Sequence, residues 1–267
     1  MRIRCGYEII YECPAPTPML LMLNLRPERL SDLETPDVIR SDPSIPLTQY
    51  RDQFGNLCSR ILAPAGRFSL SADFVVRDSG LPDPVFPDAW QTPVDLLPDD
   101  VIVFLLGSRY CDTQELNDIA WALFADIAPG WARAQAIVQY VHQRITFGYE
   151  FARPNKTATD AHTERNGVCR DYAHLAITLC RCMNIPARYC TGYIGDIDFP
   201  PVDEMDFSAW IEVYLGAQWR TLDARHNTPR IGRVMMAMGR DATDVAIITN
   251  FGPATLAEFT VIAEELG

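Results

Sequence analysis

"RNGVCRDYAHLAITLCRC", residues 165–182, is the stretch that decides the fold. Apolar side chains recur at helical spacing after Cys169, and Pro186 follows the last of them. They are Tyr172, Leu175, Ala176, Leu179 and Met183. The spacing therefore predicts an amphipathic helix that begins near Cys169 and ends before Pro186.

Cys169 falls in the first turn of this predicted helix, two residues after Gly167. A thiol there lies at the positive end of the helix macrodipole, beside backbone N–H groups that have no partner within the helix. Both features favour the thiolate, and the same N–H groups can stabilise an oxyanion. The residue by itself also fits a plainer interpretation, a small buried apolar side chain.

The chain on either side of this helix shows a consistent order of elements. Two further helices are predicted upstream, in "CDTQELNDIAWALFADI" (111–127) and "PGWARAQAIVQYVHQRI" (129–145). Downstream, "SAWIEVYL" and "QWRTLDA" flank Gly216-Ala217 and predict a β-hairpin. A helix that begins with cysteine and is followed by a hairpin is the order of a papain-like core.

The N-terminal part of the chain is predicted to be β-rich. "RFSLSADFVV" (67–76) alternates apolar and polar residues, and "LTQYRDQFGNLCSRILA" (47–63) predicts two strands around a turn. Five prolines then lie between residues 78 and 100. We therefore expect an α+β protein with a β-rich domain at 1–80, a proline-rich connector at 81–100 and a second domain at 101–267.

Composition excludes several classes of function. The net charge of −12 over 267 residues argues against binding nucleic acid or an anionic membrane through bulk electrostatics. The start of the chain lacks the apolar core of a signal peptide, and the longest apolar runs fall short of the ~20 residues of a membrane-spanning helix. The eight cysteines include no C-x-x-C pair. We expect free thiols, a cytoplasmic location, and neither metal nor cofactor.

Two longer segments carry a family resemblance. "GVCRDYAHLAITLCRCMNIPARYCTGYIGD" and "DFSAWIEVYLGAQWRTLDARHNTPRIGR" resemble the bacterial transglutaminase-like family, close to its cysteine-protease branch, over roughly residues 100–262. In that family a cysteine opens the helix, a histidine begins the first hairpin strand and an aspartate ends the second. By position, the resemblance implies that Cys169 is the nucleophile and Asp223 the orienting acid, and it places Ser208 where the histidine would be.

The general base is the open question. A serine hydroxyl cannot take a proton from a thiol near neutral pH. His226 comes three residues after Asp223. Three strand residues span ~10 Å, so His226 can fill the space beside Ser208 only if the chain turns back. The alternative is an ordinary loop histidine.

The other three histidines fit structural roles better. His142 is predicted to be an exposed helix residue, and His162, in an irregular segment, a surface residue. His174 lies five residues after Cys169, about 140° around the helix axis, so it faces away from the thiol.

A basic cluster follows the predicted hairpin. Arg225, Arg230 and Arg233 could bind a substrate carboxylate. Pairing with the protein's own surplus carboxylates is the simpler interpretation.

The leading hypothesis is thiol-dependent acyl transfer or hydrolysis at a peptide or glutamine-type amide, with Cys169, Asp223 and His226 as catalytic residues. The resemblance favours hydrolysis over cross-linking and implies a peptide or protein substrate. The alternative is a transglutaminase-like module that lost its base at Ser208 and binds a peptide or protein without turnover. The sequence leaves the oligomeric state open.

Overall fold

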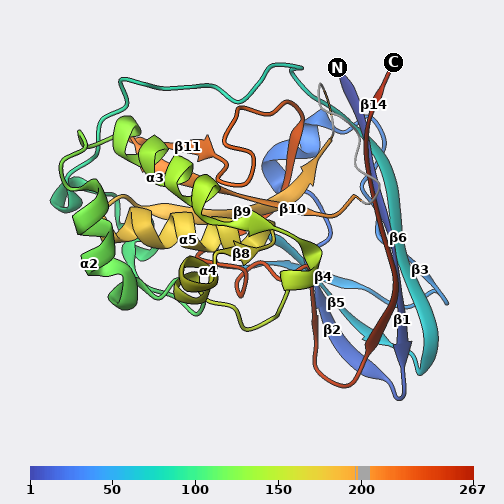
Figure 1. The fold of residues 1–267 in the computed structure, drawn as a ribbon. Coiled ribbons are helices and arrows are strands. Elements are labelled where there is room, and N and C mark those ends of the chain that lie inside the picture. The colour runs from blue at the N-terminus through green and yellow to red at the C-terminus, as the bar shows by residue number, and fades with distance from the viewer. Residues whose placement is uncertain (196, 198–204) are drawn as a thin grey trace.

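The protein is described by a computed structural model over residues 1–195, 197 and 205–267. Helices gather on one side of the molecule and long strands on the other, with both chain ends at the same edge (Figure 1). None of the helices in the described part is both long and apolar enough to cross a membrane.

The strand-rich side consists of two four-stranded antiparallel sheets. The first has the order β14-β1-β6-β3 and the second β13-β2-β5-β4. Their bounds are β1 (Arg2–Cys13), β2 (Thr17–Leu21), β3 (Arg40–Asp42), β4 (Thr48–Arg51), β5 (Leu57–Ala63), β6 (Gly66–Arg77), β13 (Ile248–Asn250) and β14 (Thr255–Leu266). The 3₁₀ helix η1 (Pro27–Asp32) follows β2.

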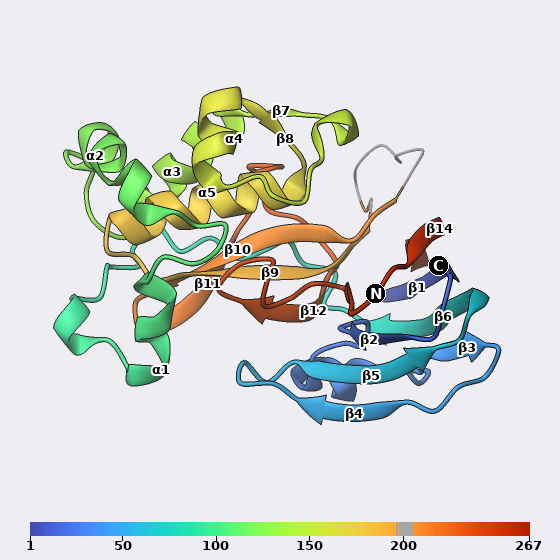
Figure 2. The ribbon, with the colours of Figure 1, turned by 90° about the horizontal axis from the view of Figure 1, so that it is seen from below.

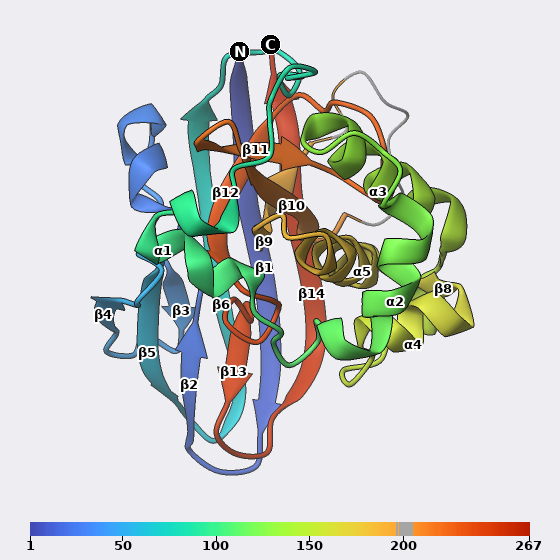
Figure 3. The same cartoon turned by 90° about the vertical axis from the view of Figure 1, so that its left-hand side faces the viewer.

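The C-terminal strand completes the first of these sheets. β14 pairs with β1 along its length, from Arg2 opposite Leu266 to Glu12 opposite Thr255, so the two termini lie together (Figure 3). The strand-rich side therefore draws residues from both ends of the chain.

The proline-rich segment 81–100 carries the 3₁₀ turn η2 (Val94–Leu96) and the start of α1 (Asp99–Ile102), which runs into η3 (Val103–Leu105). The boundary placed in this segment stays a prediction.

The second half forms a helical layer on a third antiparallel sheet, of order β11-β10-β9-β12. Seen from below, this sheet lies between the helices and the N-terminal strands (Figure 2). The bounds are α2 (Thr113–Phe124), α3 (Trp131–Arg144), α4 (Ala158–Glu164), α5 (Cys169–Cys182), β9 (Ala187–Ile194), β10 (Ser208–Leu215), β11 (Gln218–Leu222) and β12 (Arg233–Gly239). The short strands β7 (Thr146–Phe147) and β8 (Asn166–Gly167) pair in parallel, and η4 (Tyr149–Phe151) follows β7. The α+β class and the papain-like core are confirmed.

Alternation along β10 explains the layering. Ala209, Ile211 and Val213 pack into the core that contains α5, whereas Trp210 packs on the opposite face against Cys190. Because both faces of β10 are covered, α5 is held over one side of the sheet and the N-terminal strands over the other. Helix α5 begins at Cys169, as the sequence predicts.

Candidate active site

The segment before Cys169 is fixed by a close approach of Asp171 to the backbone. The Asp171 carboxylate accepts a hydrogen bond from the N–H of Val168 at 2.9 Å and so caps the start of α5. A Cβ on Gly167 would lie 2.6 Å from Oδ2 of Asp171. Glycine is therefore required at this position, and the thiol enters the helix in a defined place.

Lys156 holds the same segment from the other side. It is the chain's only lysine, and its side chain is 1% exposed. Its Nζ donates to the carbonyl of Asn166 at 3.1 Å and to Oδ1 of that residue at 2.7 Å, and it pairs with Glu164 at 3.1 Å. This contact was not foreseen from the sequence, where the signal was a lone lysine in an arginine-rich chain.

The Cys169 sulfur lies beside the first residues of β10, at 4.0 Å from the Phe207 carbonyl oxygen. Cys169 is half-buried, whereas the other seven cysteines, all within the described residues, are buried. Burial and the nearby Asp206 raise the pKa of the Cys169 thiol to about 11, although Arg225 and the N–H of Ala209 act in the opposite direction. The N–H of Arg170 at the helix start lowers the pKa of the thiol, in the direction that the sequence predicts, but burial and Asp206 outweigh it.

Asp223 is buried at the end of the second hairpin strand, and both of its oxygens are engaged. Oδ1 accepts the backbone N–H groups of Arg225 and His226 at 2.9 and 3.0 Å. Oδ2 accepts Nδ1 of His226 at 2.8 Å and Nη2 of Arg233 at 2.9 Å. Burial by itself raises the pKa of Asp223, but Arg233 and His226 together hold it well below its usual range. The carboxylate is therefore charged at neutral pH.

The chain turns back after Asp223, as the placement of His226 requires. The N–H of Asn227 donates to the Asp223 carbonyl at 2.8 Å, and Asn227 has the left-handed φ of 50°. Two side chains of α3 hold this turn in place. Gln135 donates to Oδ1 of Asn227 at 3.0 Å, and Nδ1 of His142 contacts the Arg225 carbonyl at 2.9 Å.

The face of the sheet that carries Asp223 is also the face of position 208. Ser208 and Trp210 are two residues apart on β10 and so share a face. Arg233 lies over the Trp210 ring at 5.1 Å and binds Asp223. Arg233 therefore links the Asp223 carboxylate to the face of β10 that carries Trp210 and Ser208.

Comparison with known proteins identifies the family. The model of the transglutaminase-like superfamily matches residues 122–224, which include Cys169, Ser208 and Asp223 but end before His226. A solved structure from Cytophaga hutchinsonii, described as a "putative cysteine protease", is 30% identical with a TM-score of 0.86 over 100% of this chain and 91% of its own. The chain belongs to the transglutaminase-like superfamily.

Mycobacterial proteins of unassigned function are also similar to this transglutaminase-like chain. The uncharacterized protein ML0607 of Mycobacterium leprae is 25% identical over 92% of this chain and 90% of its own length. The uncharacterized protein Rv2569c of Mycobacterium tuberculosis is 26% identical over 73% of this chain and 68% of its own. These relatives extend the likeness beyond the segment that the family model matches.

Two other histidines of this transglutaminase-like protein are structural. His162 was expected at the surface, but it is buried, and its Nε2 is 2.8 Å from the Tyr140 hydroxyl. His174 is buried on α5, stacks on Tyr110 with ring centroids 5.0 Å apart, and accepts the N–H of Ala242 at 3.1 Å. His142 is exposed, as the sequence predicts.

The basic cluster after the hairpin is divided among separate partners. Arg233 pairs with Asp83 at 2.7 Å and with Asp223, which supports pairing with the protein's own carboxylates. Arg225 lies over the Phe147 ring at 4.0 Å, and Arg230 donates to the Gly195 carbonyl at 3.0 Å. The sequence pointed to these arginines but not to their partners.

Asp206 was missed from the sequence although it directly precedes "FSAW". It is half-buried, and burial raises the pKa of its carboxyl group.

No hydrogen bond joins the Cys169 sulfur to an imidazole within residues 1–195, 197 and 205–267. Across that same part of the chain, no three His, Cys, Asp or Glu side chains gather in a way that could hold a metal ion.

Proposed function

We propose that this protein is a thiol-dependent enzyme that acts on the amide carbonyl of a peptide or of a glutamine side chain, with hydrolysis favoured over transfer to an amine. One observation carries the proposal: Nδ1 of His226 lies 2.8 Å from Oδ2 of Asp223, at the edge of the sheet on which the Cys169 helix packs. A histidine oriented by a buried carboxylate is the arrangement that thiol activation needs.

In the proposed mechanism His226 is the base. Because its Nδ1–H donates to Asp223, the other nitrogen carries the lone pair that accepts the proton of the Cys169 thiol. The thiolate attacks the carbonyl carbon, and backbone N–H groups at the start of α5 stabilise the oxyanion. The tetrahedral intermediate expels an amine, which takes the proton back from His226, and a thioester remains. Water then attacks the thioester with His226 again as base, releasing the acid and restoring the thiol.

The electrostatics of the site make such a base necessary. A thiol with a pKa of about 11 is almost wholly neutral at pH 7. A charged Asp223 stabilises the imidazolium that forms when the proton moves to His226. Arg225 contributes in the same direction by favouring the thiolate.

The test is labelling with a peptide that ends in a thiol-reactive electrophile. We expect Cys169→Ala to abolish labelling, His226→Ala to reduce it strongly and Ser208→Ala to change it little. Labelling of His226→Ala at the wild-type rate would contradict the proposed base. Retention of label by Cys169→Ala would contradict the nucleophile.

Two observations support the second candidate, a catalytically inactive module that binds a peptide or protein. Ser208 occupies the family's base position, and burial raises the pKa of the Cys169 thiol. In this case His226→Ala would change nothing, and peptides would bind without being cleaved. Ser208→His would then raise labelling, provided that the space beside Asp223 admits a second ring.

We also propose a cytoplasmic location and a peptide or protein as the partner. All eight cysteines are free, which suits a reducing compartment. Cell fractionation followed by immunoblotting tests the location. Recovery of the protein mainly from a periplasmic or extracellular fraction would contradict it.

A further inference from the structure

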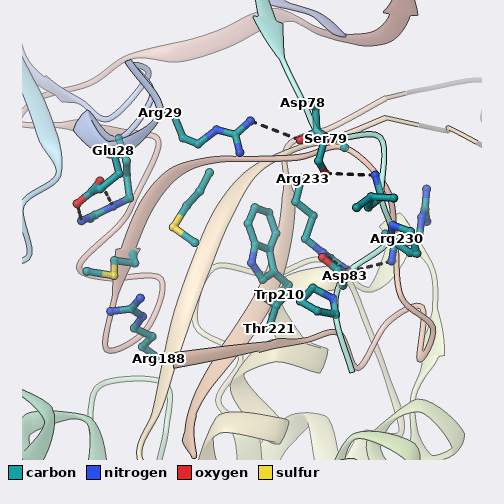
Figure 4. Close-up of a pocket in the computed structure, with 17 residues that line it drawn as sticks. Glu28, Arg29, Asp78, Ser79, Asp83, Arg188, Trp210, Thr221, Arg230 and Arg233 are labelled. Carbon is teal, nitrogen blue, oxygen red and sulfur yellow. Dashed lines mark hydrogen bonds and ion pairs between the residues drawn. The ribbon is translucent and has the colours of Figure 1, made fainter. Parts of the chain in front are cut away.

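A cavity of about 680 Å³ lies on the face of the β11-β10-β9-β12 sheet that Trp210 occupies, away from α5. Its walls come from three distant parts of the chain: residues 26–29, the segment 78–84, and the sheet with the turn before β12. Figure 4 shows Trp210 near the middle of the lining, with Arg29 and Asp78 above it and Asp83 to its right. The volume is in the range of small-molecule sites, ~300–1,000 Å³.

One part of the wall is apolar. Trp210 is 1% exposed, and Met235 and Met238 lie beside it in the lining. Leu81 and Pro82 close the cavity from the connector side. An indole ring with two flexible thioether side chains suits an aromatic or branched aliphatic group, because methionine adapts its shape to what it contacts.

The same wall carries an arginine with a buried nitrogen that has no partner among the described residues. Arg233 has a side chain only 8% exposed, with Nε bound to Asp83 and Nη2 to Asp223. Its Nη1 is buried without a hydrogen bond. A buried guanidinium nitrogen needs an acceptor, and a carboxylate oxygen is the acceptor that matches it best. Among the described residues none accepts a hydrogen bond from this nitrogen, so a ligand oxygen that reached it would complete the site.

The charges of the lining limit what the ligand can be. Five arginines face three carboxylates in the cavity wall, namely Arg26, Arg29, Arg188, Arg230 and Arg233 against Glu28, Asp78 and Asp83. This balance favours an anion over a cation. Two more carboxylates, Glu212 and Asp223, hold Arg188 and Arg233. The arginines of the wall are thus largely neutralised within the protein, so the cavity suits a ligand with a single carboxylate rather than a polyanion.

We propose that this cavity binds a small organic carboxylate with an aromatic or branched apolar body. Its carboxylate would reach the buried Nη1 of Arg233 after a shift of the side chains around that nitrogen, and its body would lie against Met235 and Met238, beside Trp210. A free small molecule and the carboxyl end of a peptide share this chemistry. The cavity does not include the Cys169 thiol, although Arg233 joins its wall to Asp223, and binding can be measured without the proposed reaction.

Isothermal titration calorimetry of the Cys169→Ala protein tests the proposal without turnover. The first pair of probes is N-acetyl-L-phenylalanine and its neutral amide. The second pair is a pentapeptide that ends in phenylalanine, with a free or an amidated carboxyl group. We expect a free carboxylate to bind at least about tenfold more tightly than its matched amide, because the amide loses a charge-assisted hydrogen bond. Binding of the free amino-acid derivative identifies a small molecule as sufficient, whereas binding of the peptide alone identifies a chain end.

A filling variant locates the binding. Met238→Trp adds a large ring to the cavity and should weaken carboxylate binding at least about tenfold. Leu123→Trp adds the same ring on the exposed surface of α2 and should leave binding unchanged. Equal affinity for carboxylate and amide, no binding of any probe at millimolar concentration, or undiminished binding by a folded Met238→Trp protein would each overturn the proposal.

Discussion

Replacing His226 with alanine is the change that separates an enzyme from an inactive binding module. With a pKa of about 11, an unassisted Cys169 is thiolate to roughly one part in 10⁴ at pH 7, because each pH unit below the pKa lowers the fraction tenfold. If His226 takes the proton of the thiol, the reaction no longer depends on the small fraction of thiolate present at pH 7. A general base contributes about 10²–10⁴-fold, so His226→Ala should slow alkylation of Cys169 at pH 7 by at least about 100-fold.

The assay is the rate at which iodoacetamide alkylates Cys169, measured by mass spectrometry at a series of pH values. The wild-type rate should depend less steeply on pH, because the imidazole rather than hydroxide takes the proton of the thiol. The rate of His226→Ala should instead climb about tenfold per pH unit toward pH 11. Ser208→Ala, a neighbouring polar-to-apolar change, serves as the control and should follow the wild type. A His226→Ala profile that coincides with the wild type would refute the reasoning.

Three further changes test the support of the site and its response to acid. Lys156→Met removes the ammonium group that holds β8. It should lower the free energy of unfolding by about 1–3 kcal/mol, measured by urea denaturation, and slow alkylation of the Cys169 thiol, measured by labelling. Gly167→Ala brings a methyl group to 2.6 Å from Oδ2 of Asp171 and should cost about 1–3 kcal/mol, whereas Gly267→Ala, with nothing within 4 Å, should be neutral in thermal denaturation. Burial lowers the pKa of His174 in the folded protein. Its contribution to the free energy of unfolding is therefore complete above the pKa of about 6.5 that histidine has in the unfolded chain, and it is lost as the pH falls toward the lower pKa of the folded state. His174→Gln should therefore reduce the loss of stability on acidification.

Local patterns predicted the elements that carry the site. The apolar periodicity after Cys169 located α5, because a buried helix has to repeat its apolar face every turn. The hairpin followed from Gly216-Ala217, and both residues adopt the left-handed conformation of a two-residue turn, each with φ of 59°. The family resemblance identified Cys169 and Asp223 as candidate site residues, and the three-residue separation from Asp223 in the sequence identified His226.

Long-range pairing could not be predicted in the same way. β14 pairs with β1 from the opposite end of the chain, and no local signal specifies which strand an edge will meet. The pKa of Cys169 depends on burial and on Asp206, which come from tertiary packing. His162 was misplaced for the same reason, since its burial arises from the contact of α4 with Tyr140 on α3.

The relocated base is geometrically reasonable because Asp223, rather than position 208, fixes where an imidazole can stand. Ile211 pairs with Leu222, so continuing the register places Asp223 opposite Trp210, two residues from Ser208. A histidine can therefore reach the same carboxylate oxygen either from the start of β10 or from a turn that folds back after β11. The second route requires a rigid turn, and Oδ1 of Asp223 provides it by accepting two backbone N–H groups within that turn. One carboxylate thus both shapes the turn and orients the ring that the turn carries. For this reason Asp223→Asn should impair the site more than Ser208→Ala, since an amide loses the charge that stabilises an imidazolium at His226.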